Sequence, residues 1–191
     1  MNTTEHLAQA FIGECMARNR YTMYAKAART DGYEQIGGIF LETAENEREH
    51  SKWFFNMMNQ AGAKQGMAKI KVESEVPNVL GNTAMNLKAA IAGEHYENSE
   101  MYPEIAEVAE KEGFNDVGTR VRMIAKAEGH HESRYQKLLK ELEGGTLFKK
   151  GKKVSWVCRE CGYVHDGLEP PMKCPSCDHL KAFYQVLSEN Y

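Results

Sequence analysis

The chain has 191 residues, of which 42% are hydrophobic and 27% are charged, a composition typical of a globular protein rather than a disordered or fibrous one. It has no run of about 18 apolar residues, and its first residues do not form a basic segment followed by an apolar one. We therefore expect no membrane span and no secretory signal. A cytoplasmic location is expected. A formal net charge of −3 argues against general nucleic-acid binding. The length allows one large domain, or one domain and a small module.

Apolar periodicity and turn residues predict four long helices, over residues 3–30, 33–61, 82–112 and 115–143. Asp31-Gly32 forms the first turn, Gly62 ends the second helix, and Pro103 should kink or interrupt the third. The expected caps are Thr3 or Thr4 for the first helix, Asn82 or Thr83 for the third and Asn115 for the fourth. Residues 63–81 alternate like an extended segment.

The two halves of this helical region repeat each other. The repeated motifs are Ala10-x-x-Gly13-Glu14 with Ala90-x-x-Gly93-Glu94, and Ala44-x-x-Glu47-x-x-His50 with Ala125-x-x-Glu128-x-x-His131. Glu14 and Glu47 stand 33 residues apart, and Glu94 and Glu128 stand 34 apart. Each half is therefore expected to be a helical hairpin that carries one single Glu and one Glu-x-x-His.

The positions of these residues relative to the turns predict where they meet. Residues equidistant from the turn of an antiparallel hairpin lie at one height, here about 24 Å from it. Positions i and i+3 share a helix face, so Glu47 and His50 point the same way. An up-down-up-down bundle would need only a short loop between the hairpins, whereas a twofold arrangement reverses the second hairpin. The connection must then span a helix of about 42 Å, and 19 extended residues reach about 60 Å.

Buried carboxylates are unfavourable unless cations accompany them, so the repeat predicts metal ions at the centre of the bundle. Four-helix bundles that bind two iron or two manganese ions share this pattern: two helices each provide one Glu, and the other two each provide a Glu-x-x-His. The alternative is a solvated charged helix face. Glu97, three residues after Glu94, is a further candidate ligand, or a surface residue.

Four of the five cysteines form paired C-x-x-C motifs near the end of the chain: Cys158, Cys161, Cys174 and Cys177. Such pairs predict a tetrathiolate metal site, and the spacing does not distinguish zinc from iron. Gly162 would let the backbone turn and offer its N–H to a thiolate, and Trp156, Tyr163 and Phe183 would supply a small core. We expect a bundle over residues 1–145, a lysine-rich linker over 146–153 and the cysteine module over 154–191.

Motifs across the whole chain resemble the rubrerythrin family. They are Gly13-Glu14-x-x-Ala17-x-x-Arg20-Tyr21, Glu47-Arg48-Glu49-His50, Gly93-Glu94-His95-x-Glu97, Glu100-Met101-Tyr102-Pro103, Glu128-x-x-His131, Cys158-x-x-Cys161-Gly162-Tyr163 and Cys174-Pro175-x-Cys177. The resemblance implies a ferritin-like four-helix bundle with a long crossover, followed by a small rubredoxin-like β module. It implies these di-iron ligands: Glu14, Glu47, His50, Glu94, Glu97, Glu128 and His131. Glu47 and Glu128 would bridge, and the four cysteines would hold one iron.

The resemblance also implies an activity, that of a non-haem di-iron peroxidase protecting against oxidative stress. Hydrogen peroxide would be reduced to water with electrons from a rubredoxin or a reductase, relayed through the Fe(Cys)4 centre. The implied catalytic residues are Glu97 and His50, one of which replaces the other at one iron as its redox state changes, and Tyr21 and Tyr102, which hydrogen-bond ligand carboxylates. A head-to-tail homodimer or a larger homo-oligomer is expected, without nucleic acid or membrane.

Neighbouring residues create two ambiguities. His130 adjoins His131 but breaks the i+3 spacing, so His131 is the expected ligand; Cys15 is expected to be a small packed residue. Two other functions remain open: a ferroxidase, iron-handling or oxygen-reducing di-iron protein, and a zinc-ribbon binding module on a helical bundle. The sequence leaves the physiological electron donor and the preference for peroxide or oxygen undetermined.

Overall fold

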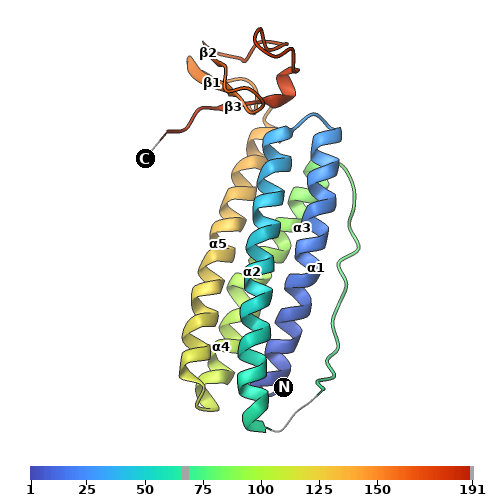
Figure 1. Ribbon diagram of the computed structural model, residues 1–191, viewed down its shortest axis with the longest axis vertical. Coiled ribbons are helices and arrows are strands. Elements are labelled where there is room, and N and C mark those ends of the chain that lie inside the picture. The colour runs from blue at the N-terminus through green and yellow to red at the C-terminus, as the bar shows by residue number, and fades with distance from the viewer. Residues whose placement is uncertain (66–68, 190–191) are drawn as a thin grey trace.

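The computed structural model describes residues 1–65 and 69–189, and its larger part is an antiparallel bundle of long helices (Figure 1). The helices are α1 (Thr3–Thr30), α2 (Glu34–Gln65), α3 (Thr83–Tyr96), α4 (Tyr102–Lys111) and α5 (Asn115–Glu143), with a short π-helix, η1 (Glu97–Met101), between α3 and α4. α1 packs along α2, and α3, η1 and α4 together pack along α5. The predicted four-helix bundle is confirmed.

A long crossover connects the two hairpins. Residues 69–81 have no regular secondary structure and run beside α1 along the bundle (Figure 1). α3 then begins at the α1–α2 turn, where Asp31 Oδ2 accepts hydrogen bonds from the N–H and hydroxyl of Thr83 at 2.8 and 2.6 Å. The second hairpin is therefore reversed, as expected. Part of the predicted extended segment is helical, because α2 continues through Gly62 to Gln65, and residues 66–68 lie outside the described part.

The residues that cap the helices differ in part from those predicted. Asn2, not Thr3 or Thr4, caps α1, because its side chain accepts from the Glu5 N–H while Glu5 bonds back to the Asn2 N–H. Asn82 caps α3 as expected, by accepting from the Met85 N–H at 3.0 Å. Asn115 is the first helical residue of α5, and Phe114 precedes it without a side-chain cap.

The interruption expected from Pro103 lies just before that residue. The N–H of Tyr102 bonds to the carbonyl of Glu97, five residues back, which makes η1 a π-helical turn. Proline has no N–H to continue the regular ladder and sits in the first turn of α4, where that loss is tolerated. The π-helical turn begins at Glu97, so it sets the direction in which this carboxylate leaves the helix.

The interior of the bundle holds two apolar clusters on either side of a polar layer. One cluster is built around Leu7, Phe54 and Ile105, and the other around Tyr24 and Phe40. Most of the predicted metal ligands lie between them. Among the described residues, no helix combines the length and the apolar character that a bilayer span requires.

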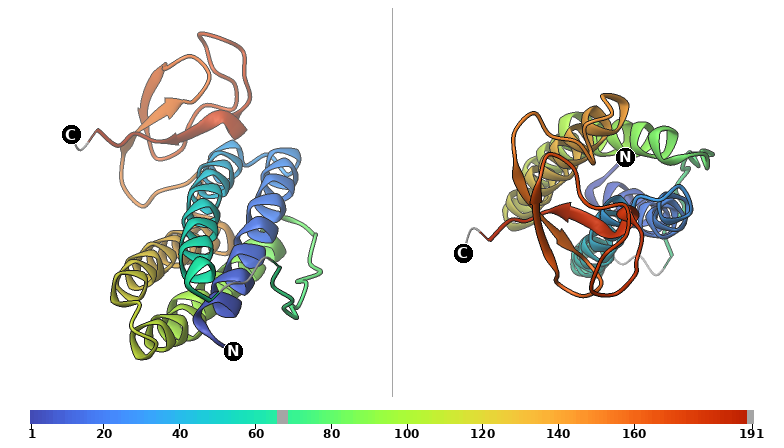
Figure 2. Two further views of the ribbon diagram at one scale, coloured as in Figure 1. Left: turned by 60° about the horizontal axis from the view of Figure 1, so that its bottom comes forward. Right: turned by 90° about the horizontal axis from the view of Figure 1, so that it is seen from above.

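The cysteine module forms a three-stranded antiparallel sheet at the bundle end that carries the α1–α2 turn (Figures 1 and 2). Its elements are β1 (Val154–Cys158), β2 (Val164–Gly167), η2 (Lys181–Phe183) and β3 (Tyr184–Val186), in the order β2-β1-β3. The predicted small β module is confirmed. Its core differs from the prediction, since Trp156 and Tyr184 are fully buried whereas Tyr163 is 37% exposed. Phe148 packs against both this core and the bundle.

Candidate metal centres

Six of the seven predicted bundle ligands converge in the polar layer. The single glutamates Glu14 and Glu94 come from α1 and α3, and the two Glu-x-x-His pairs come from α2 and α5. The four glutamates and His131 are buried, while the side chain of His50 is 13% exposed. Their donor atoms form two groups, each within 4.8 Å: Glu14, Glu47, His50 and Glu128, and Glu47, Glu94, Glu128 and His131.

Glu47 and Glu128 belong to both groups. The Nδ1 of His50 lies 3.0 Å from Glu47 Oε2 and 2.8 Å from Glu128 Oε1. The Nδ1 of His131 lies 3.3 Å from Glu47 Oε1 and 2.8 Å from Glu128 Oε2. Each shared carboxylate thus offers one oxygen to either side, which is the arrangement that a carboxylate bridging two metal ions requires.

A buried tyrosine holds each of the two single glutamates. The hydroxyl of Tyr21 donates to Glu94 Oε1 and that of Tyr102 donates to Glu14 Oε1, both at 2.5 Å. Both tyrosines are at most 1% exposed, so these hydroxyls have exchanged water for a carboxylate oxygen. The second oxygen of Glu14 has no hydrogen-bond donor among the described residues, and it remains free for a metal.

Glu97 stands apart from both groups. It begins η1 and is half-buried beside Gly13, where a Cβ would lie 3.8 Å from Glu97 Oε1. The carboxylates of Glu94, Glu128 and Glu47 act on it electrostatically, so it borders the same centre. The structure therefore places the seventh predicted ligand at the edge of the site.

The electrostatics of the site show why it requires cations. Burial, and then the neighbouring carboxylates, raise the pKa of Glu14 and of Glu97 well above the usual range. Burial raises the pKa of Glu94 to about 8. Burial alone would lower the pKa of both histidines. The carboxylates of Glu128 and Glu47 outweigh this effect and raise the pKa of His50 to about 9 and that of His131 to about 12. Without a metal, protons must compensate the carboxylates.

The donor set fits a pair of metal ions. Besides Glu14 Oε2, both oxygens of Glu128 and Glu47 Oε1 lack a hydrogen-bond donor of good geometry in the described residues, although all are buried. Buried polar atoms without partners are rare in proteins and point to a missing ion or water. Four carboxylates with two imidazoles suit iron or manganese at a bundle centre.

The four cysteines of the module also meet. Their sulfur atoms lie within 4.8 Å of one another, with Cys158 Sγ 3.7 Å from Cys177 Sγ and Cys161 Sγ 3.6 Å from Cys174 Sγ. Cys158 and Cys174 are buried and Cys161 is exposed. Gly162 has the expected positive φ of 77°, but its N–H bonds to the Cys158 carbonyl at 2.9 Å rather than to a thiolate.

Sequence reasoning did not single out Tyr184, which lies beside Cys174. Burial would raise the pKa of Cys174, but the Tyr184 hydroxyl and the N–H groups of Ser176 and Cys177 outweigh it and lower that pKa to about 6. These donors favour the thiolate that a metal binds. Phe183 ends the short helix η2 and Tyr184 begins β3, a change of backbone conformation between two adjacent aromatic residues that the sequence pattern did not indicate.

The other histidines and Cys15 lie outside the two donor groups of the bundle and the four-cysteine group. His130 is exposed and belongs to neither group, and Cys15 is half-buried and free. His6 is buried, and His95 lies 3.2 Å from Glu132. His165 and His179 lie in the module, outside the four-cysteine group. The choice of His131 over His130 thus agrees with the geometry.

Comparison with known proteins yields two family models and close relatives. The model "Rubrerythrin" matches residues 5–139, and the model "Rubrerythrin, rubredoxin-like domain" matches residues 156–185. A putative rubrerythrin of Methanocaldococcus jannaschii is 57% identical over 192 residues, covering 99% of this chain and 94% of the relative. A rubrerythrin of Clostridium perfringens is 47% identical, covering 99% and 96%.

A solved structure of nigerythrin in a partially reduced state is 31% identical, with a TM-score of 0.63, and covers 98% of this chain and 87% of that one. The similarity thus extends over both the bundle and the module. Together with the two donor sets, it supports non-haem iron at both centres.

Proposed function

The chain belongs to the rubrerythrin family of oxidoreductases, and from this premise we propose that it is a non-haem di-iron peroxidase. Hydrogen peroxide is its substrate and water its product, and electrons reach the bundle by way of the four-cysteine centre. One observation carries the proposal: two donor groups share Glu47 and Glu128 in a chain that also holds a four-cysteine group. The first arrangement suits two-electron chemistry on a small molecule, and the second suits one-electron transfer.

The proposal assigns each side chain a role. Glu14, Glu47, His50, Glu94, Glu97, Glu128 and His131 hold the di-iron centre, and Glu47 and Glu128 bridge it. When bound, two ferrous ions supply the two electrons that cleave the O–O bond of peroxide. Tyr21 and Tyr102 fix the orientation of Glu94 and Glu14 through their hydroxyl groups. Because Glu97 is half-buried at the edge of the site, it can exchange a proton with solvent and with a peroxide oxygen.

The four cysteines Cys158, Cys161, Cys174 and Cys177 hold one iron in this proposal. The exposed Cys161 marks the side on which an external donor, such as a rubredoxin or a reductase, approaches. The module lies at one end of the bundle (Figure 1), whereas Glu14 and Glu47 lie about midway along α1 and α2. A head-to-tail homodimer would bring the module of one chain to the bundle of the other, and we include it in the proposal.

The proposed domains are the bundle over residues 1–145, the linker over 146–153 and the module over 154–191. The cytoplasmic location remains a prediction.

Replacement of one surface thiolate separates the roles of the two domains. We expect Cys161→Ala to abolish peroxide turnover driven by an external reductant, because the module can no longer pass electrons on. The chemically reduced bundle should still consume one equivalent of peroxide per di-iron centre. Normal continuous turnover by this variant would contradict the relay.

Metal analysis tests the remaining alternatives. The proposal requires about three irons per chain, two in the bundle and one in the module. Zinc in the module together with an empty bundle would favour the zinc-ribbon function. Accumulation of iron beyond that number during aerobic incubation with ferrous salt would favour iron handling.

A further inference from the structure

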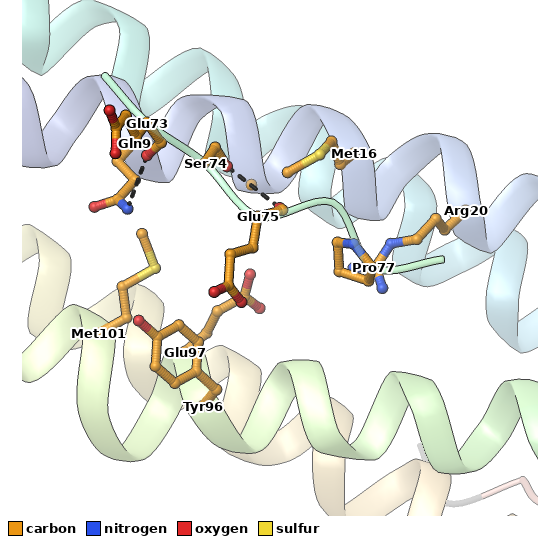
Figure 3. Close-up of a pocket in the computed structure, with 11 residues that line it drawn as sticks. Gln9, Met16, Arg20, Glu73, Ser74, Glu75, Pro77, Tyr96, Glu97 and Met101 are labelled. Carbon is orange, nitrogen blue, oxygen red and sulfur yellow. Dashed lines mark hydrogen bonds between the residues drawn. The ribbon is translucent and has the colours of Figure 1, made fainter. Parts of the chain in front are cut away.

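A pocket of about 630 Å³ borders the proposed di-iron site on the side of the crossover (Figure 3). Three separate segments form it: α1, the crossover, and the end of α3 with η1. Its lining includes Gly13, Met16, Glu75, Pro77, Tyr96 and Met101. The crossover residues are exposed, so the pocket opens to solvent on that side.

Glu97 connects this pocket to the centre. Of the seven proposed bundle ligands, it alone lines the pocket. Gly13 faces the Glu97 carboxylate, and the absence of a side chain there leaves room beside Oε1. A molecule in the pocket can therefore reach the edge of the metal site without displacing a buried side chain.

The pocket is far larger than hydrogen peroxide needs. A water molecule occupies about 30 Å³ in the liquid, and hydrogen peroxide is little larger. Pockets for small organic molecules measure about 300 to 1,000 Å³ and combine apolar walls with a few polar groups. Here the thioethers of Met16 and Met101 and the rings of Pro77 and Tyr96 supply apolar surface near the Glu97 carboxylate. Methionine side chains adapt to apolar groups of varied shape.

We propose that this pocket seats the alkyl or aryl group of an organic hydroperoxide, so that the protein reduces organic hydroperoxides as well as hydrogen peroxide. This proposal rests on the proposed peroxidase function. The reaction is ROOH + 2e⁻ + 2H⁺ → ROH + H₂O: the O–O bond breaks, two O–H bonds form, and a one-electron donor of the rubredoxin type supplies both electrons through the chain. The hydroperoxide head lies at Glu97, and the organic group lies against Met16, Pro77 and Met101.

A substitution at Glu75 can test the role of this pocket. It stands on the exposed crossover, and its side chain extends into the pocket toward Glu97 (Figure 3). It belongs to neither metal group. Glu75→Trp places a bulky ring in the part of the pocket nearest Glu97, whereas Glu75→Gln removes the charge and keeps the size, so the pair separates volume from charge.

The test compares kcat/KM for cumene hydroperoxide and hydrogen peroxide in the iron-loaded full-length protein with one electron donor. We expect wild type and Glu75→Gln to reduce both, with values for each substrate within about threefold of each other. Glu75→Trp should lower kcat/KM for cumene hydroperoxide at least tenfold and that for hydrogen peroxide less than threefold. Equal loss of both activities, or no loss of either, would overturn the assignment of the pocket.

A binding measurement separates this proposal from the peroxidase function on which it rests. The product alcohol of cumene hydroperoxide, 2-phenyl-2-propanol, is titrated calorimetrically into the resting iron-loaded protein. Binding by wild type and Glu75→Gln, and its loss in Glu75→Trp, would support the pocket even if turnover failed. Turnover of hydrogen peroxide without turnover of cumene hydroperoxide, or without binding of the alcohol, would refute the organic substrate and leave the peroxidase function intact.

Discussion

Glu47 and Glu128, on α2 and α5, each direct one carboxylate oxygen toward His50 and the other toward His131. The centroids of the two histidine rings lie 6.0 Å apart, and the ring planes are inclined by 28°. The sequence repeat is thereby expressed as a pseudo-twofold arrangement in space. Each half of the chain provides one glutamate shared by both donor groups, one histidine and one single glutamate, so neither hairpin forms the donor groups alone.

Removal of a bridging carboxylate should empty the bundle and spare the module. For Glu47→Ala we expect iron to fall from about three to about one per chain, because both donor groups lose an oxygen ligand. Elemental analysis of anaerobically reconstituted protein measures this. The matched control is Glu49→Ala on the same helix, whose partly exposed carboxylate pairs with Lys52. Equal iron contents in the two variants would contradict the bridging role.

Metal binding in the bundle should strengthen as the pH rises. In the metal-free protein the raised pKa values of about 9 for His50, 12 for His131 and 8 for Glu94 keep these groups protonated at neutral pH. A metal must displace those protons, so the affinity should rise at least about tenfold per pH unit near neutrality. Chelator competition with Mn²⁺ between pH 6.5 and 7.5 measures the slope, and a pH-independent affinity would be incompatible with this explanation.

The tyrosine that holds Glu14 should matter for both stability and turnover. Tyr102→Phe removes the donor 2.5 Å from a buried carboxylate oxygen, and we expect unfolding free energy to fall by about 1–3 kcal/mol and peroxide turnover to fall as well. The matched control is Tyr24→Phe, because the Tyr24 hydroxyl is bonded to the Val79 carbonyl at 2.8 Å, away from the ligands. This control should lose stability and keep its turnover. Chemical denaturation and a peroxide assay on both variants provide the comparison.

The hydroxyl of Tyr184 should tune the module. The Tyr184 hydroxyl is buried beside Cys174 without a hydrogen-bond partner of good geometry among the described residues, so it is available to a metal-bound sulfur. Donors to such a sulfur stabilise the reduced, more negative state, so Tyr184→Phe is expected to shift the reduction potential of the Fe(Cys)4 centre to more negative values. Tyr163→Phe changes an exposed tyrosine of the same module and should leave the potential unchanged. Redox titration of the visible absorption measures both, and an equal shift would show that the Tyr184 hydroxyl has no specific role.

The sequence was sufficient to predict the residues whose positions follow from helix geometry. The 33- and 34-residue intervals and the i+3 spacing placed Glu14, Glu47, His50, Glu94, Glu128 and His131 at one level. The crossover was predictable because residues 63–81 form an extended segment long enough to span a helix, as a twofold arrangement of the two hairpins requires. Both inferences use periodicity and length, which a single sequence contains.

Features that depend on competition between neighbours were not predictable. Asn2 and Thr3 can both cap a helix, and the reciprocal bond with Glu5 decides in favour of Asn2. Either Tyr163 or Tyr184 could have been the tyrosine buried in the core of the module, and only the strand register places Tyr184 there. The π-helical turn at Glu97 packs against α5, and Pro103 by itself indicates an interruption without giving its type or its exact place. The pocket arises where the crossover passes the helices, and no local pattern marks it.

The central claim is that peroxide oxidises the bundle and that the module then refills it with electrons. The most direct measurement mixes fully reduced, iron-loaded protein anaerobically with hydrogen peroxide in a stopped-flow spectrometer and follows the visible absorption of the ferric four-cysteine centre. We predict rapid appearance of this absorption in wild type and a rate at least tenfold lower in Glu47→Ala, whose module is unchanged. Equal rates in the two proteins would mean that peroxide oxidises the module directly, and would contradict the account.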